Sequence, residues 1–371
     1  MLDVVVIGGG PAGAALAARL AQAGADVAVL ERSAYPRPKV CGEFLAAPGV
    51  RELDALGLPQ AALRASEMRR VALWAGESDL QAPLVLARAL AREVLDTLLL
   101  EQARRAGARV YQPARAIAVE RTGRGMFKVV ALPRLELSTR AVVAAHGSWE
   151  PGGLATQCTR SPPARRDLFG FKAHFARHGV PAGTVALVPF AGGYAGALAL
   201  QDGRATFACS VERGVLQAIR RQHAGLAAGD ALFRHALASS AALREAFAGS
   251  VREQAWLAAG PLRPGARPVV RDGIFTIGNA AGEVHPIVGE GITLALQSAA
   301  ALARPLTEAL ARGGDCAEAV PQYGRQHRAL FRRRLWRSSV LAALATHPLL
   351  ARSAREGLRY APSLLALAAR G

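Results

Sequence analysis

The sequence opens with Asp3-Val4-Val5-Val6-Ile7, an uninterrupted apolar run, followed at once by Gly8-Gly9-Gly10-Pro11-Ala12-Gly13. A short apolar run predicts a buried strand, and the glycines match the pattern G-x-G-x-x-G ahead of an alanine-rich helical stretch. Gly24 ends that stretch, and Asp26 to Leu30 is a second apolar run with Glu31 directly after it. Strand, glycine turn, helix, strand and acid in this order predict a dinucleotide-binding site at the start of a Rossmann-like domain.

Each glycine of the turn has its own physical reason. Gly8 permits the tight turn, Gly10 lets the backbone approach a pyrophosphate, and Gly13 lets the helix pack closely on the strand. Pro11 and Ala12 begin the helix, whose N-terminus offers unpaired N–H groups to phosphates. The acid after the second strand accepts hydrogen bonds from ribose hydroxyls and disfavours a 2′-phosphate, so NADP is the least expected occupant.

The chain has 371 residues, a length typical of two or three domains. Hydrophobic residues make up 51% and charged residues 20%, which excludes a disordered chain, and aromatic residues at 5% give few stacking surfaces for nucleic-acid bases. The formal charge is +18, but the 46 basic residues include only three lysines, Lys39, Lys128 and Lys172. We therefore assign most of the charge to an arginine background in an alanine-rich chain, and we expect no nucleic-acid partner.

The four cysteines, Cys41, Cys158, Cys209 and Cys316, are far apart and form no pattern typical of a metal site or a disulfide framework. We therefore expect no metal and a reducing, cytoplasmic location. The first apolar run is too short to span a membrane and has no basic segment before it. Neither a signal peptide nor a transmembrane helix is expected.

Two further stretches carry motifs. Arg92-Glu93-Val94-Leu95-Asp96 opens an amphipathic helical stretch, and Gly278-Asn279-Ala280-Ala281-Gly282 follows a predicted strand. After the second stretch come His285-Pro286 and then Gly289-Glu290-Gly291-Ile292, at the start of a long helix. Together with the N-terminal motif, these segments resemble the FAD-binding motifs of the flavoprotein monooxygenases built on the para-hydroxybenzoate hydroxylase fold. The geranylgeranyl reductases share that fold, so the resemblance implies an FAD-dependent oxidoreductase of this superfamily.

The resemblance also implies roles for individual residues. Arg92 approaches the cofactor, Asn279 stands where the family has an aspartate that touches the ribityl chain, and the helix start at Gly291 and Ile292 faces the isoalloxazine ring. An amide still hydrogen-bonds a ribityl hydroxyl, and a positive helix end favours the anionic reduced flavin. The implied FAD contacts are Gly8, Gly10, Pro11, Ala12, Gly13, Glu31, Arg32, Cys41, Gly42, Arg92, Gly278, Asn279, Gly289, Gly291 and Ile292.

The loop Lys39-Val40-Cys41-Gly42-Glu43 resembles the family segment that passes beside the flavin, where reductase relatives have Cys-Gly-Gly. Gly42 permits a close approach of the backbone to the ring. Cys41 is either a residue at the flavin edge or a small buried side chain. Because no second strand, G-x-G-x-x-G and helix unit follows, NAD(P)H is expected only as a transient electron donor.

The motif positions predict an α/β fold with an α+β second domain, in which a β-sheet substrate domain interrupts a Rossmann-like FAD-binding domain and helices end the chain. We assign residues 1–66, 88–160 and 262–330 to the FAD-binding domain, residues 67–87 and 161–261 to the substrate domain, and residues 331–371 to a helical basic tail. The tail alternates arginines with apolar blocks. That pattern indicates either helices packed on the FAD-binding domain or a peripheral membrane contact.

Four residues are candidates for chemistry and substrate binding. In the stretch 169–175, a period of two places Phe171 on one face of a strand and His174 on the other. Tyr194 lies at a predicted hairpin tip. These three are the candidate substrate contacts, although aromatic side chains on one strand face more often form a core. His285 is the candidate acid–base catalyst, with a helix-capping or core role as the alternative.

The leading hypothesis from the sequence is an FAD-dependent monooxygenase that hydroxylates a hydrophobic aromatic or polyketide-like small molecule. By the resemblance, NAD(P)H reduces the flavin, O2 adds at its C4a position, and one oxygen atom passes to the substrate. The alternative is an FAD-dependent reductase of carbon–carbon double bonds in isoprenoid lipids, although Tyr194-Ala195-Gly196 departs from the aromatic Y-x-W-x-F-P string of those enzymes.

Two other functions are disfavoured. Flavin-dependent halogenation is disfavoured because no W-x-W-x-I string occurs in the sequence. A flavin-bearing binding or sensor protein without catalytic activity is disfavoured because the chain has room for a whole substrate domain.

Overall fold

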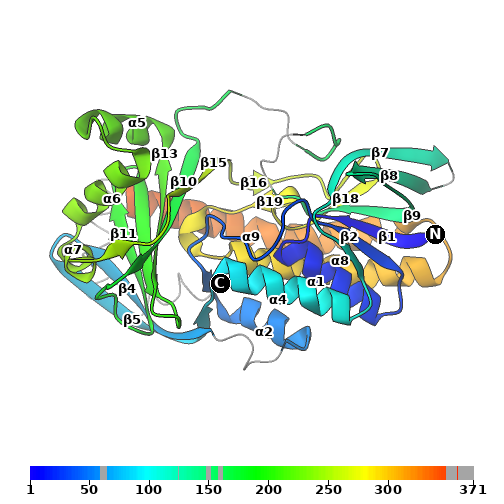
Figure 1. Ribbon diagram of the computed structural model, residues 1–371, viewed down its shortest axis with the longest axis horizontal. Coiled ribbons are helices and arrows are strands. Elements are labelled where there is room, and N and C mark those ends of the chain that lie inside the picture. The colour runs from blue at the N-terminus through cyan, green and yellow to red at the C-terminus, as the bar shows by residue number, and fades with distance from the viewer. Residues whose placement is uncertain (59–64, 124, 148–151, 158–161, 348–356, 358–371) are drawn as a thin grey trace.

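The computed structural model describes residues 1–58, 65–123, 125–147, 152–157, 162–347 and 357. Two β-sheets lie next to each other along the long axis of the molecule, each with its own helices (Figure 1). The N-terminal strand belongs to one sheet, and the segment from β10 to β13 belongs to the other. The predicted α/β fold with a second β-sheet unit is confirmed.

The first sheet is parallel at its centre, where β1 pairs with β2 on one side and with β9 on the other. The apolar sequence of β1 suits this central place, because a parallel strand is covered on both faces. In sheet order the strands are β17 (Val270–Arg271), β18 (Ile274–Thr276), β9 (Leu135–Ala144), β1 (Leu2–Ile7), β2 (Val27–Leu30) and β6 (Arg109–Tyr111). Two more strands, β7 (Arg115–Gly123) and β8 (Met126–Leu132), form a hairpin that pairs with β9 through β8.

Helices cover one face of this sheet and the β7–β8 hairpin covers the other. Val4 and Val6 pack in the core under the helices, whereas Val5 and Ile7 pack under the hairpin. This alternation is the period of two of a strand buried on both faces. The helices of this layer are α1 (Pro11–Gln22), α2 (Ala47–Ala55), α4 (Arg92–Arg105) and α8 (Gly291–Ala311).

The second sheet is antiparallel except where β11 runs parallel to β4. Its central strands are β10 (Leu168–Ala176), β13 (Ala205–Glu212), β12 (Gly193–Ala199) and β11 (Thr184–Phe190). The remaining strands are β4 (Ser66–Ala75), β5 (Ser78–Ala89), β3 (Phe44–Leu45), β14 (Val251–Arg252) and β15 (Leu257–Leu262). The predicted segment 67–87 therefore corresponds to the β4–β5 hairpin.

Three helices, α5 (Arg213–Gln222), α6 (Ala228–Ser239) and α7 (Ala241–Ala246), cover one face of the second sheet. An aromatic core lies under them, in which the rings of Phe175 and Phe233 stack with their centroids 4.8 Å apart. Phe171 belongs to the same core. Lys172 and His174 lie on the opposite face, where both contact Glu43, so the predicted alternation along this strand is confirmed.

The last described helix, α9 (Val320–Thr346), packs along α8. The predicted boundary at residue 331 is wrong, because α9 passes through it without a break and Phe331 stacks on His327 with ring centroids 4.4 Å apart. The rest of the predicted tail, apart from Gly357, and the boundary between residues 160 and 161 lie outside the described residues. Within the described ranges, no helix is both long and apolar enough to span a bilayer.

Candidate functional site

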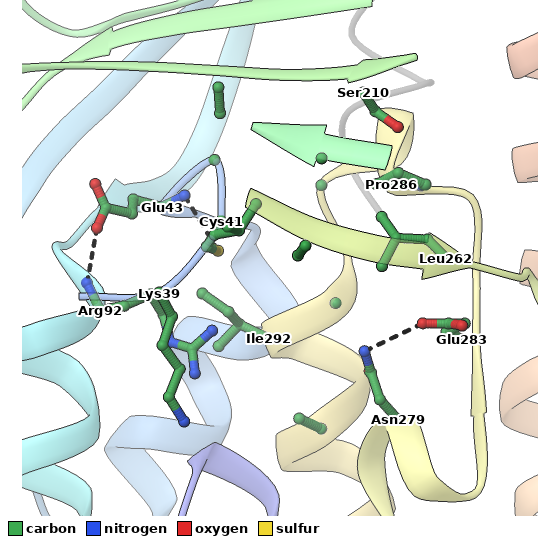
Figure 2. A pocket seen from close by; sticks show the side chains of 18 of the residues that line it. Lys39, Cys41, Glu43, Arg92, Ser210, Leu262, Asn279, Glu283, Pro286 and Ile292 are labelled. Atoms are coloured by element: carbon green, nitrogen blue, oxygen red, sulfur yellow. Dashed lines mark hydrogen bonds between the residues drawn. The ribbon is translucent and has the colours of Figure 1, made fainter. Parts of the chain in front are cut away.

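A cavity of about 1050 Å³ is lined by residues of both sheets. One side of its wall consists of the glycine turn after β1, the loop after β2 and the start of α8. The other side includes strands β4, β10, β11, β12, β13 and β15 and the C-terminal part of α9. Figure 2 shows this junction, with the loop that contains Cys41 and Glu43 facing the segment that contains Asn279 and Pro286.

The glycine turn brings α1 against the strands. Gly8 has a φ of +111°, and a Cβ there would lie 2.5 Å from the carbonyl oxygen of Ala145. A Cβ on Gly13 would lie 1.9 Å from the carbonyl oxygen of Gly8. At the helix start, Gly10 makes no side-chain cap, so the first N–H groups of α1 remain available to an anion at the cavity.

Glu31 follows β2 and holds its carboxylate at the cavity wall. One oxygen accepts a hydrogen bond from the Gly9 N–H at 2.8 Å, and the other accepts one from the Ser33 N–H at 2.9 Å. These bonds fix the carboxylate beside the glycine turn, where it lines the cavity. The arrangement suits an acceptor for ribose hydroxyls, as the sequence predicts.

Arg92 lies in the first turn of α4 and lines the cavity. Its guanidinium donates two hydrogen bonds to the buried carboxylate of Asp96, both at 2.7 Å. Burial lowers the pKa of the nearby Lys39 ammonium, and the charge of Asp96, 3.6 Å away, opposes that shift. The bidentate pair orients the Arg92 side chain at this part of the wall.

Asn279 lies in a short 3-10 helix, η1 (Gly278–Ala280), and lines the cavity. Its Nδ2 approaches the Oε2 of Glu283 at 3.5 Å, as Figure 2 shows. Glu283 belongs to β19 (Gly282–Glu283), which pairs with β16 (Gly265–Ala266). Its other oxygen accepts bonds at 3.0 Å from the Arg267 guanidinium and from the Arg263 N–H. Glu283 is therefore held in place from several sides and orients the amide of Asn279.

His285 lies beside the cavity rather than on its wall. It caps η2 (Pro286–Val288), where its Nδ1 accepts a hydrogen bond from the Ile287 N–H at 3.3 Å. Burial lowers the pKa of the His285 ring to about 4, so the ring is uncharged at neutral pH. This geometry matches the capping alternative, and a catalytic role for His285 stays a prediction.

The three predicted substrate contacts separate in space. Tyr194 lines the cavity, whereas Phe171 and His174 do not. The correction has a simple cause: Phe171 faces the core under α5 to α7, and His174 is fully buried against Glu43. Cavity-facing positions of β12 and β13 instead hold small side chains, among them Gly196 and Ala208.

The predicted FAD contacts fall into two groups. Two of them, Gly13 and Gly278, lie off the cavity wall and act through packing, since a Cβ on Gly278 would lie 2.8 Å from the Cβ of Ala12. The others line the cavity: Gly8, Gly10, Pro11, Ala12, Glu31, Arg32, Cys41, Gly42, Arg92, Asn279, Gly289, Gly291 and Ile292.

The sequence does not indicate the role of Glu43, whose carboxylate makes several polar contacts. Its carboxylate has no exposed surface and bonds Lys172, His174 and Thr206 of the second sheet. Burial alone would raise the pKa of the Glu43 carboxyl, but the hydrogen bond from His174 and the charge of Lys172 lower it to about 2. The sequence contains one indication of this contact, because a lysine on the inner face of a strand needs a counter-charge. It does not show which acid supplies that charge.

Comparison with known proteins identifies the family. A family model described as an FAD binding domain matches residues 1–154. A digeranylgeranylglycerophospholipid reductase of Methanopyrus kandleri is 30% identical over 325 residues, which cover 79% of this chain and 77% of that protein. The chain belongs to the geranylgeranyl reductase family.

This geranylgeranyl reductase family member also resembles other flavoproteins over part of its length or in fold. A menaquinone reductase of Mycobacterium tuberculosis is 35% identical over 160 residues, 41% of this chain and only 39% of that protein's length. The flavin-dependent brominase Bmp2 has the same fold with a TM-score of 0.80 at 16% identity, covering 100% of this chain and 93% of that one. The myxobacterial halogenase CndH gives 0.77 at 23% identity, covering 90% of this chain and 81% of that one.

The residues on the cavity wall fit FAD. The uncapped N-terminus of α1 and the turn at Gly10 suit the pyrophosphate, and Glu31 suits the ribose. The amide of Asn279 suits the ribityl chain, and the backbone at Gly42 and the start of α8 line the remaining wall of this part. When bound, FAD supplies two-electron redox chemistry, and the protein supplies orientation and a dry environment. This family member is therefore an FAD-dependent oxidoreductase.

Two glycine variants separate packing from cofactor binding. Gly13→Ala places a methyl group against the Gly8 carbonyl, and overpacking of this kind costs about 1–3 kcal/mol of unfolding free energy or more. Gly10→Ala meets only the far end of Lys39, at 4.0 Å, so we expect normal stability and weaker FAD binding. Denaturant unfolding and titration with FAD measure the two effects. Equal stability losses in both variants would contradict this assignment.

The ring of His285 gives a prediction for stability against pH. The folded protein keeps the ring neutral with a pKa of about 4, against 6.5 for an ordinary histidine. The unfolded chain therefore takes up the proton first, and the free energy of unfolding falls as the pH drops from about 6.5 to 4, by up to about 3 kcal/mol.

The variant His285→Asn tests this dependence, because its side-chain oxygen still accepts the bond from the Ile287 N–H and does not titrate. We expect the variant to lose less stability than the wild type when urea unfolding is compared at about pH 7 and about pH 4.5. An identical loss in both proteins would show that the ring is not held neutral.

Proposed function

We propose that this protein is an FAD-dependent reductase of carbon–carbon double bonds in a long, apolar, prenyl-type substrate. The observation that carries the proposal is the aliphatic wall of the cavity on the side of the second sheet. Val71 and Leu73 of β4, Val185 and Leu187 of β11 and Leu198 of β12 all line it. A wall of this kind binds hydrocarbon chains through burial of apolar surface.

The names of two relatives support the same proposal. The Methanopyrus kandleri protein that covers most of this chain is named for the reduction of a digeranylgeranyl lipid. The Mycobacterium tuberculosis relative is named for the reduction of menaquinone. Both names describe large apolar substrates, which suits the volume and lining of the cavity.

The chain supplies a few polar groups at the substrate wall. Ser210 is buried, and within the part of the chain that the structure describes its Oγ has no hydrogen-bond partner. It lies across from Tyr194 on the neighbouring strand, and both line the cavity. Burial raises the pKa of the Tyr194 phenol, so its Oη keeps a proton that it donates to a substrate oxygen or to a reduced carbon. We propose NAD(P)H as the electron donor that reduces the flavin.

Monooxygenation of an aromatic or polyketide-like molecule is the second candidate. The observation in its favour is the segment Tyr194-Ala195-Gly196, which lacks the aromatic string expected of an isoprenoid reductase. In the structure, Gly196 and Ala197 leave space on the cavity wall at this place. We infer that this space admits a ring-shaped substrate.

An anaerobic assay decides between the two candidates. With a prenylated lipid or a polyprenyl quinone, we expect reduced enzyme to be reoxidised without oxygen, while the product gains two hydrogen atoms for each double bond lost. Mass spectrometry of the product after turnover under isotopically labelled oxygen is the second arm. Incorporation of the label into a hydroxylated product, with no anaerobic reoxidation, would reject the reductase and favour the monooxygenase.

We also propose that α9 contacts a membrane surface, from which an apolar substrate enters. Trp336, Val340 and Leu344 are exposed and follow one another at the spacing of one helix face. Leu344 also lines the cavity, so this apolar stripe reaches the cavity wall. Arg332 and Arg333 are exposed on the same helix and suit anionic headgroups.

Liposome flotation tests the contact. We expect the full chain to float with vesicles that contain anionic lipid, and Trp336→Ser to float severalfold less because Trp is a strong interfacial anchor. Val85→Ser is the matched control, since Val85 is 67% exposed and belongs to β5 rather than to α9. Equal flotation of the two variants would reject α9 as the contact.

A further inference from the structure

The carboxylate of Glu43 joins three separate parts of the chain. Its Oε1 accepts hydrogen bonds from Lys172 Nζ and, at 2.9 Å, from the backbone N–H of Arg92. Its Oε2 accepts bonds from His174 Nε2 at 2.8 Å and from Thr206 Oγ1 at 2.5 Å. Lys172 and His174 belong to β10, Thr206 to β13 and Arg92 to α4. Both oxygens are thus fully used, and one side chain connects the loop after β2 to α4 and to the second sheet.

The charges around this carboxylate balance. Arg204 Nη1 lies 3.0 Å from His174 Nδ1, and because a guanidinium only donates, Nδ1 must be the unprotonated nitrogen. His174 Nε2 then donates its proton to Glu43. One negative charge on Glu43 then faces one positive charge on Lys172, both fully buried. Full hydrogen bonding offsets part of the cost of desolvating such a pair, whereas the loss of one partner leaves an uncompensated buried charge.

The backbone conformation at Glu43 is also unfavourable in free energy. Its φ of +60° lies in the left-handed region, which is unfavourable for a residue with a Cβ. The Glu43 N–H donates to Cys41 Sγ at 3.3 Å, and the Glu43 carbonyl accepts from the Leu90 N–H at 2.9 Å. Such backbone strain persists only where the surroundings hold it, and it gathers at functional sites.

The position of Glu43 in the chain indicates which part of the cavity its strained backbone holds in place. Cys41 and Gly42, directly before Glu43, line the cavity on the side that fits FAD. On β10 and β13, Gly170 and Ala208 line the cavity from the substrate side, close in sequence to the residues that bind Glu43. In Figure 2, the loop crosses the cavity edge between Arg92 and the strands of the second sheet.

We propose that Glu43 is a positioning residue: its buried carboxylate locks the loop of Cys41 and Gly42 onto the second sheet, and thereby sets the place of the flavin relative to the substrate wall. Such an attachment matters because the residues that fit FAD and those of the proposed substrate wall belong to different sheets. Misplacement of reacting groups by about 1 Å costs on the order of a hundredfold in rate. The proposal rests on FAD binding and not on which reaction the flavin carries out.

The variant Glu43→Gln tests this positioning role, because the side chain keeps almost the same shape. The amide keeps one acceptor oxygen, so the donors on one side of the side chain face an NH2 group instead. We expect the visible absorption bands of bound FAD to change and FAD to bind about tenfold or more weakly. We also expect the reduction potential of the flavin to become more positive, because Lys172 then lacks its counter-charge.

Asp167→Asn is the matched control. The Asp167 carboxylate is also buried and also accepts two bonds from one cationic side chain, Arg263, at 2.9 and 2.7 Å. It lies at the start of β10 and does not line the cavity. We expect this variant to lose stability while the spectrum, affinity and potential of its FAD stay at wild-type values.

Two outcomes overturn the proposal. One is a Glu43→Gln protein that loses stability as the control does, with an unchanged flavin spectrum, affinity and potential, which would make Glu43 a structural residue only. If that variant does not fold, Thr206→Val decides, because it removes one donor and leaves both charges paired. We expect a smaller change in the same three flavin properties, and a wild-type flavin in this folded variant would equally reject the lock.

Discussion

The first turn of α1 lies directly on the end of β1, with no side chain between them. A Cβ on Gly13 would sit 1.9 Å from the carbonyl oxygen of Gly8, and a Cβ on Gly8 would sit 2.5 Å from the carbonyl oxygen of Ala145 after β9. This contact puts the N-terminus of α1 at the carboxyl ends of two parallel strands, the usual place of nucleotide phosphates in such sheets. Glu31, Asn279 and the start of α8 are then arranged around the same cavity. The cofactor side of the site depends on this one glycine contact.

The second sheet forms the other side of the cavity. Glu43 joins it to the first unit through bonds to β10, β13 and α4. A fully bonded ion pair at a junction is specific because any slip of the sheets would leave a buried charge without its partner. The two costs gathered at this residue, an unfavourable φ and two desolvated charges, are consistent with a function at the site rather than with stability alone.

The fold by itself does not choose the reaction. Brominase and halogenase structures share it at 16% and 23% identity, whereas a relative that covers 79% of this chain is named as a reductase. One fold hosts several flavin reactions because the cofactor supplies the redox chemistry and the cavity wall selects what meets it. In this protein the wall of the second sheet is largely aliphatic, with small residues on β12 and β13 and the hydroxyls of Tyr194 and Ser210.

The sequence by itself determined the first sheet, the FAD side of the site and the alternation of faces on β10, because these depend on local patterns: apolar runs, glycine spacing and a period of two. Only the tertiary structure decided which residues meet across the cavity. In the structure, Phe171 packs in the aromatic core and His285 caps a short helix. Helix α9 continues through residue 331, and Glu43 pairs with a lysine 129 residues away. Such contacts join segments that share no local signal, so they exist only once the two sheets have packed together.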